Sequence, residues 1–77
     1  MTYFDRGNAK YVLENYHGAI DDYTNATELK PDYAEAYRMR GMAKGTLGDG
    51  VEGCADLKRA AELGSAKAID AYRMICK

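Results

Sequence analysis

An eight-residue segment occurs twice in this sequence, and the spacing of its two copies restricts the fold more than any other feature. Tyr3 to Lys10 (YFDRGNAK) and Tyr37 to Lys44 (YRMRGMAK) share Tyr, Arg, Gly, Ala and Lys at matching places, thirty-four residues apart. The same period relates Leu13 to Leu47, Asp22 to Asp56, Ala26 to Ala60, Glu28 to Glu62 and Leu29 to Leu63. A fixed period of this size indicates a repeat architecture built from stacked units.

Length and composition limit the class of protein. The chain has 77 residues, 47% hydrophobic and 30% charged, which is typical of one small folded domain rather than a disordered segment. A net charge of −1 gives no long-range attraction for nucleic acid or an anionic membrane. No apolar run approaches the ~20 residues that span a bilayer, and residues Met1 to Arg6 lack the basic and apolar regions of a signal peptide. We therefore expect no nucleic acid and no membrane partner, and a cytoplasmic location.

The spacing of apolar residues predicts five helices. Their expected ranges are Thr2 to Glu14, Tyr16 to Leu29, Ala34 to Leu47, Val51 to Leu63 and Ala66 to Lys77. Asn15, Asp49 and Ser65 stand where N-caps of the second, fourth and fifth helices are needed. Pro31 ends the second helix, and Gly48 suits the left-handed conformation that follows the third.

The apolar stripes of these helices indicate which side chains are inside. Val12 and Leu13 are expected to complete the stripe of the first helix. Asp21 and Asp22 are expected to lie in solvent, as charges near the start of the second helix.

Two glycines lie in the middle of helices, at Gly7 and Gly41, where each costs about 1 kcal/mol relative to alanine. A cost that is repeated suggests a packing reason. Ala19 and Gly53, near the starts of the partner helices, are expected to face them. The sequence therefore predicts tight antiparallel helix hairpins.

These residues resemble the tetratricopeptide repeat (TPR) family, whose pattern is a bulky aromatic, a small residue, alanine, an aromatic, alanine and proline. The first copy supplies Tyr3, Gly7, Ala19, Tyr23, Ala26 and Pro31. The second supplies Tyr37, Gly41, Gly53, Leu57, Ala60 and Ser65. It departs from the pattern at three points, where Gly53 replaces alanine, Leu57 replaces an aromatic residue and Gly64-Ser65 replaces the proline turn. Both copies share two departures from the pattern, with Arg6 and Arg40 in place of Leu and Lys10 and Lys44 in place of Tyr. Departures shared by both copies indicate a feature of a subfamily.

The resemblance implies an all-α fold: a right-handed α-solenoid of two antiparallel helix hairpins plus a C-terminal capping helix, five helices in all. A single TPR domain would then span residues 1–77, with one repeat at 1–33, a second at 34–65 and the capping helix at 66–77. The last helix would cover the apolar face that a stacked hairpin leaves bare.

The resemblance also implies a concave face, lined by the first helix of each hairpin. The candidate peptide-binding residues there are Phe4, Asn8, Tyr11, Arg38, Met39, Met42 and Arg73. Aromatic, Met and Arg side chains suit the gripping of an extended or helical peptide. Packing of Phe4, Met39 and Met42 against neighbouring helices is the alternative interpretation of these apolar residues.

No catalytic, cofactor or metal site is predicted. His17 has no companion ligands and is interpreted as a solvated turn residue. The two cysteines, Cys54 and Cys76, do not form a CxxC pair. Two reduced cysteines packed as small hydrophobic residues are the favoured interpretation, and a disulfide that ties the last helix to the repeat before it is the alternative.

Two functions from different classes remain. The favoured hypothesis is a protein–protein interaction module, with a protein or peptide partner bound on the concave face. The alternative is a structural or assembly element of a longer solenoid or a homo-oligomer, because about three repeats are normally needed for stability. An enzyme is not expected.

Overall fold

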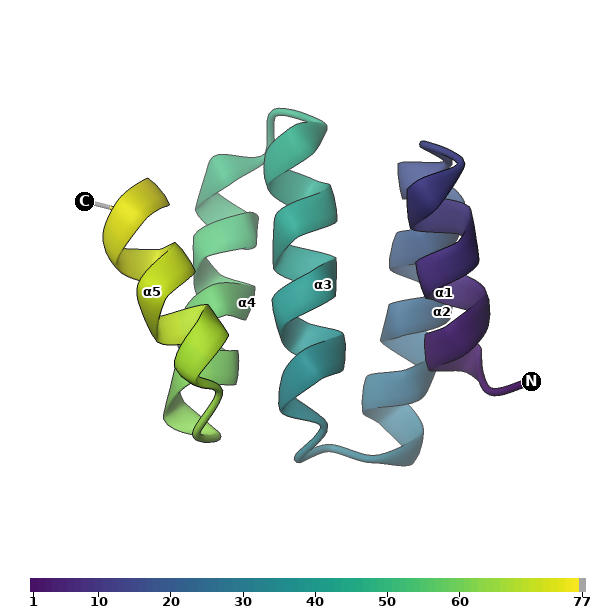
Figure 1. The fold of residues 1–77 in the computed structure, drawn as a ribbon, viewed down its shortest axis with the longest axis horizontal. Coiled ribbons are helices and arrows are strands. Elements are labelled where there is room, and N and C mark those ends of the chain that lie inside the picture. The colour runs from purple at the N-terminus through teal and green to yellow at the C-terminus, as the bar shows by residue number, and fades with distance from the viewer. Residues whose placement is uncertain (77) are drawn as a thin grey trace.

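The structure is a computed structural model that describes residues 1–76, and the expectations for Lys77 lie outside that range. Five helices and no strand occur within these residues, as the sequence predicts. The helices are α1 (Tyr3–Val12), α2 (Tyr16–Leu29), α3 (Ala34–Thr46), α4 (Gly50–Glu62) and α5 (Ala66–Ile75). Figure 1 shows them following one another across the molecule from the N-terminus to α5.

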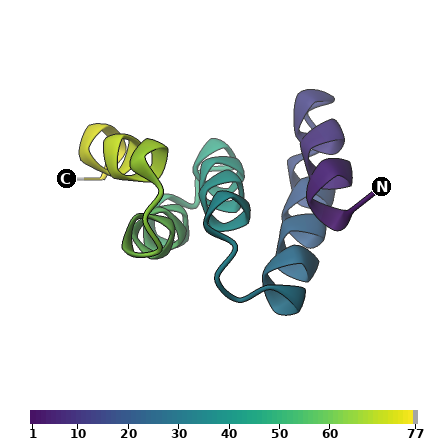
Figure 2. The ribbon, with the colours of Figure 1, turned by 60° about the horizontal axis from the view of Figure 1, so that its bottom comes forward.

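The helices are arranged in two layers. In Figure 2, α1, α3 and α5 form an upper row, and α2 and α4 form a second row below it. Each helix packs against the one that follows it in the chain, so that α2 contacts α3 as well as α1, and α4 contacts α5 as well as α3. This zigzag of hairpins is the solenoid arrangement that the repeat predicts.

Side-chain caps begin four of the helices. The side chains of Asn15, Asp49 and Ser65 accept hydrogen bonds from the backbone N–H groups of Gly18, Glu52 and Ala68, as predicted. Thr2 caps α1 through Asp5 in the same way. Each cap satisfies a donor that has no partner within its helix.

The ends of α1 and α3 are equivalent. Glu14 has φ 63°, and Gly48, at the corresponding position of the second copy, has φ 91°. The left-handed conformation at Gly48 was expected, but the extension of the first helix to Glu14 was wrong, because this residue leaves helical geometry.

The core consists of small residues around two large ones. Tyr23 and Leu57 are the largest apolar side chains that are fully buried, and the other buried apolar residues of the described chain are alanines. The expectation that Val12 and Leu13 complete an apolar stripe is wrong, since they are 79% and 78% exposed. Val12 is the last residue of α1 and Leu13 follows it, whereas the buried contact of α1 with α2 lies at Gly7.

Candidate binding face

A carboxylate is buried inside the first hairpin. Asp22 on α2 is 1% exposed, so its predicted place in solvent is wrong. Arg6 donates to it from Nε and Nη2 over 2.7–3.1 Å, and Lys10 Nζ lies 3.1 Å from Oδ2. Two cations from α1 therefore compensate the loss of hydration that burial imposes on this carboxylate.

The second hairpin repeats the cluster. Arg40 donates to both oxygens of Asp56 over 2.8 and 2.9 Å, and Lys44 Nζ lies 3.3 Å from Oδ2. Lys44 also reaches Glu52, at 3.2 Å. The Arg and Lys that depart from the family pattern in both copies thus join the two helices of each hairpin. Their role at these positions is structural.

The same pairing stabilises the charged form of Asp22. Hydrogen bonding from Arg6, helped by Lys10, lowers the pKa of the Asp22 carboxyl below its ordinary value, although burial acts in the opposite direction. Burial also raises the pKa of the neighbouring Tyr23 hydroxyl to about 12. Both groups are therefore in fixed charge states near neutral pH.

Three predicted site residues on α1 have partners among aromatic side chains. The Phe4 ring lies 4.9 Å from that of Tyr33 and 5.8 Å from that of Tyr23, measured between centroids. Asn8 accepts a hydrogen bond of 2.5 Å from the Tyr23 hydroxyl. Tyr11 packs edge-on against Tyr16, with centroids 5.2 Å apart. All three of these site residues are half-buried, so each combines a packing role with some accessible surface.

The predicted site residues on α3 are also half-buried. Arg38 donates from Nε and Nη2 to one oxygen of Glu35, and the other oxygen accepts from Ser65 at the start of α5. Hydrogen bonding from Arg38 is the main reason that the pKa of Glu35 is lowered. Met39 and Met42 follow this ion pair in the sequence of α3.

Arg73, the last predicted site residue, is exposed on α5. Among residues 1–76, no hydrogen bond or aromatic contact joins any two of the seven predicted site residues to each other. What relates Phe4, Arg38 and Arg73 is that they come from the three helices of one layer (Figure 2).

An apolar hollow of about 140 Å³ lies beside Phe4. Its walls are Thr2, Tyr3, Phe4, Ala26, Leu29, Lys30 and Tyr33. Sequence reasoning missed this hollow, because it forms where the start of α1 meets the turn after α2. Within residues 1–76, no group of three or more His, Cys, Asp and Glu side chains is placed to hold a metal ion.

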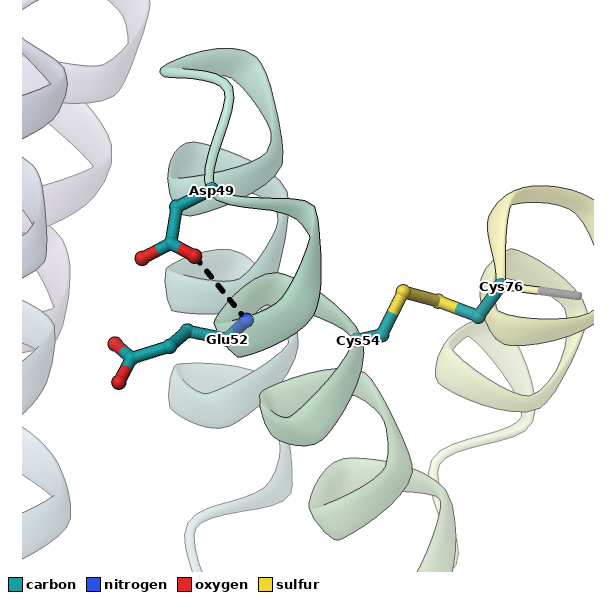
Figure 3. The surroundings of a disulfide bond; sticks show 4 residues. All are labelled: Asp49, Glu52, Cys54 and Cys76. Atoms are coloured by element: carbon teal, nitrogen blue, oxygen red, sulfur yellow. Dashed lines mark hydrogen bonds between the residues drawn. A yellow bond between two sulfur atoms is a disulfide. The ribbon is translucent and has the colours of Figure 1, made fainter.

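The favoured prediction of two reduced cysteines was wrong. Cys54 on α4 and Cys76, directly after α5, form a disulfide with Cα atoms 5.8 Å apart (Figure 3). This is the alternative that the sequence left open, since only a folded backbone shows whether two Cys residues lie at bonding distance. The bond fixes the end of α5 to α4.

Comparison with known proteins agrees with this architecture. A family model described as TPR repeat matches residues 7–48, which is more than half of the chain, so the chain belongs to the tetratricopeptide repeat family. This family consists of non-enzymatic interaction repeats, and the chain is in general terms a protein–protein interaction module.

A human protein named small glutamine-rich tetratricopeptide repeat-containing protein beta is similar to this chain. The two are 42% identical over an alignment of 53 positions, and the alignment covers 65% of this chain and 17% of the human protein. The chain thus spans a small part of that relative's length. No helix in residues 1–76 has the length and apolar character needed to cross a membrane.

Proposed function

We propose that this chain binds a peptide, or an extended or helical segment of a partner protein, along the layer formed by α1, α3 and α5. The predicted contacts are Phe4, Asn8, Tyr11, Arg38, Met39, Met42 and Arg73. The observation that carries the proposal is the central position of α3 in this layer, with Met39 and Met42 half-buried on it. Flexible thioether side chains adapt to apolar groups of different shapes.

The charges in this layer favour a ligand that carries a carboxylate. Arg73 is exposed, and no ion pair engages its guanidinium within residues 1–76. Arg38 is already paired with Glu35 over 2.7 Å. A ligand carboxylate would bind Arg38 only in competition with Glu35, which makes Arg73 the better first anchor. An amphipathic peptide with acidic and apolar residues matches this chemistry.

Titration of the ¹⁵N-labelled chain with a library of acidic amphipathic peptides tests the proposal. We expect shifts of backbone amide signals in α1, α3 and α5. Shifts confined to α2 and α4, or no shifts at millimolar peptide, would overturn it.

Charge reversal provides a matched pair of variants for a peptide found in this way. Arg73→Glu is expected to weaken binding about tenfold, because one charge-assisted contact becomes repulsive. Lys58→Glu makes the same charge change at an exposed position of α4 and is expected to leave binding within about twofold. Equal losses in both variants would indicate only a general effect of net charge.

A further inference from the structure

The last helix, α5, is too short to keep its structure without support from its neighbours. It has ten residues, and isolated helices shorter than about 12 residues are marginal in water. Among these residues only Ala68 is buried, whereas Met74 is 78% and Ile75 is 56% exposed. The order of α5 therefore depends on a few contacts with α3 and α4.

The contacts differ between the two ends of α5. At its start, the Ser65 hydroxyl donates a hydrogen bond of 3.0 Å to Glu35 on α3. At its end, the Cys76 N–H donates to the Tyr72 carbonyl oxygen over 2.8 Å and closes the last turn, and Cys76 is bonded to Cys54 of α4 (Figure 3). Within residues 1–76, no ion pair or side-chain hydrogen bond joins α4 to α5, so the disulfide is the specific link at this end.

The other helices of the same layer are held by noncovalent pairs. Helix α1 also has ten residues, and its Arg6 and Lys10 bind the buried Asp22 of α2. Helix α3 is joined to the preceding α2 by a hydrogen bond of 3.2 Å from Arg40 Nη1 to the Thr24 hydroxyl. At the junction of α4 and α5 a covalent bond takes the place of these pairs. Unlike them, it responds to a reductant.

The disulfide is suited to reversible reduction. Cys54 and Cys76 are both half-buried, so the core does not seal the bond, and the sequence contains no third cysteine with which either could pair. A thiolate of a dithiol reductant attacks one sulfur, the S–S bond breaks, and the other sulfur leaves as a thiolate that takes up a proton. The second thiol of the reductant then displaces the first sulfur, which leaves two thiols in the chain and a disulfide in the reductant. A disulfide oxidant reverses both steps.

We propose that the Cys54–Cys76 disulfide is a reversible redox switch that sets whether the second half of α5 is ordered. The switch also controls Arg73, a consequence that rests on the proposed function. Arg73 lies in the turn that Cys76 closes, whereas Phe4 and Arg38 lie on helices that the bond does not touch. In the oxidised chain Arg73 has a fixed place in the peptide-binding layer. In the reduced chain a ligand must first order α5, and this cost weakens binding.

Backbone ¹⁵N relaxation of the complete chain tests the switch without a ligand. In the oxidised chain we expect order parameters of about 0.85 in both α1 and α5. A dithiol reductant should lower the values for residues 70–76 to below about 0.6, while α1, the helix of equal length, stays near 0.85. Removal of the reductant and addition of a disulfide oxidant should restore the first values. Unchanged order parameters at residues 70–76, or an equal fall in α1, would overturn the switch.

The effect on binding is measured with the tightest-binding peptide of the acidic amphipathic library. We expect reduction to weaken its binding about tenfold. Arg73→Glu should weaken binding about tenfold in the oxidised chain but by no more than about twofold in the reduced chain, because the switch and Arg73 act through one contact. An equal loss from Arg73→Glu in both redox states would overturn the control of Arg73 by the disulfide.

Two further comparisons separate the possible causes. The Cys54→Ser/Cys76→Ser chain should bind the peptide as the reduced chain does, with or without reductant. A response of this chain to the reductant would overturn the assignment to Cys54 and Cys76. If no peptide of the library binds the oxidised chain, the proposed function fails, and the order parameters alone then decide whether the switch exists.

Discussion

The main chains of Gly41 and Gly53 are in direct contact where α3 crosses α4. A Cβ atom on Gly41 would lie 2.7 Å from the carbonyl oxygen of Gly53, and one on Gly53 would lie 2.8 Å from the carbonyl oxygen of Gly41. Backbone atoms cannot move aside as a flexible side chain can, so neither position accepts a larger residue. The first hairpin differs, because Gly7 faces the ring of Tyr23 at the equivalent crossing.

Gly53→Ala is therefore expected to destabilise the chain by about 1–3 kcal/mol, despite the higher helix propensity of alanine. Gly45→Ala is the matched control. Gly45 belongs to α3 of the same hairpin, but a Cβ atom there would meet nothing within 4 Å. We expect the control to stabilise the chain by up to about 1 kcal/mol. Urea unfolding measures both, and a neutral Gly53→Ala would contradict the close crossing.

The repeat itself explains why so much of the fold could be predicted. The period and the caps Asn15, Asp49 and Ser65 are local signals, and all five predicted helices agree with the structure to within a few residues at either end. The first prediction overran because Glu14 resembles a helical residue in type and departs from it only in φ.

The buried carboxylates show where reasoning from one helix at a time fails. A charged residue such as Asp22 is assigned to solvent when only its own helix is considered. The repeat held the signal that was missed. Arg6, Lys10 and Asp22 of the first hairpin recur together in the second hairpin, as Arg40, Lys44 and Asp56. The repeat could not predict the disulfide, because the distance from Cys54 to Cys76 depends on how α5 packs against α4.

Loss of Arg40 should affect stability more than loss of Arg6. Arg40→Ala leaves Asp56 nearly buried with Lys44 alone and also removes the link to Thr24, so we expect a loss of about 3 kcal/mol. Arg6→Ala also removes a partner of a buried carboxylate, but Arg6 is half exposed and has no link to a second hairpin. Urea unfolding of the two variants compares them; equal losses would contradict the importance of the link between hairpins.

Reduction of the disulfide should loosen α5 before any other helix. The cysteines are 22 residues apart, and a loop of that length corresponds to about 3 kcal/mol of stabilisation in the chain-entropy model. Only Ala68 of α5 is fully buried, whereas Met74 and Ile75 are exposed, so packing alone holds this helix weakly.

The measurement is hydrogen exchange with and without a dithiol reductant. We expect α5 amides to exchange much faster after reduction, while amides of α1 and α2 change little. A Cys54→Ser/Cys76→Ser chain should behave like the reduced protein in either condition. Uniform acceleration along the chain would instead show that α5 unfolds together with the rest.

Acid should destabilise the chain through Asp22. Hydrogen bonding from Arg6 keeps the pKa of this carboxyl in the folded state below its ordinary value of 3.8. The unfolded state therefore binds more protons than the folded state near that pH. The contribution of the Asp22 carboxylate to stability is complete above about pH 4, and it is lost as the pH falls through the folded-state pKa. Glu35, whose pKa is lowered by Arg38 and Ser65, acts in the same direction from about its ordinary value of 4.5.

The free energy of unfolding, measured with urea between about pH 2 and 7, should therefore be level near neutrality and fall steeply below about pH 4. Asp22→Asn removes one titrating group, so we expect lower stability at pH 7 and a shallower fall in acid. Asp21→Asn, at the exposed neighbouring position of α2, is the matched control and should keep the slope of the unchanged chain. An Asp22→Asn chain with an unaltered acid slope would mean that the pairs of Asp22 with Arg6 and Lys10 add no stability that depends on its charge.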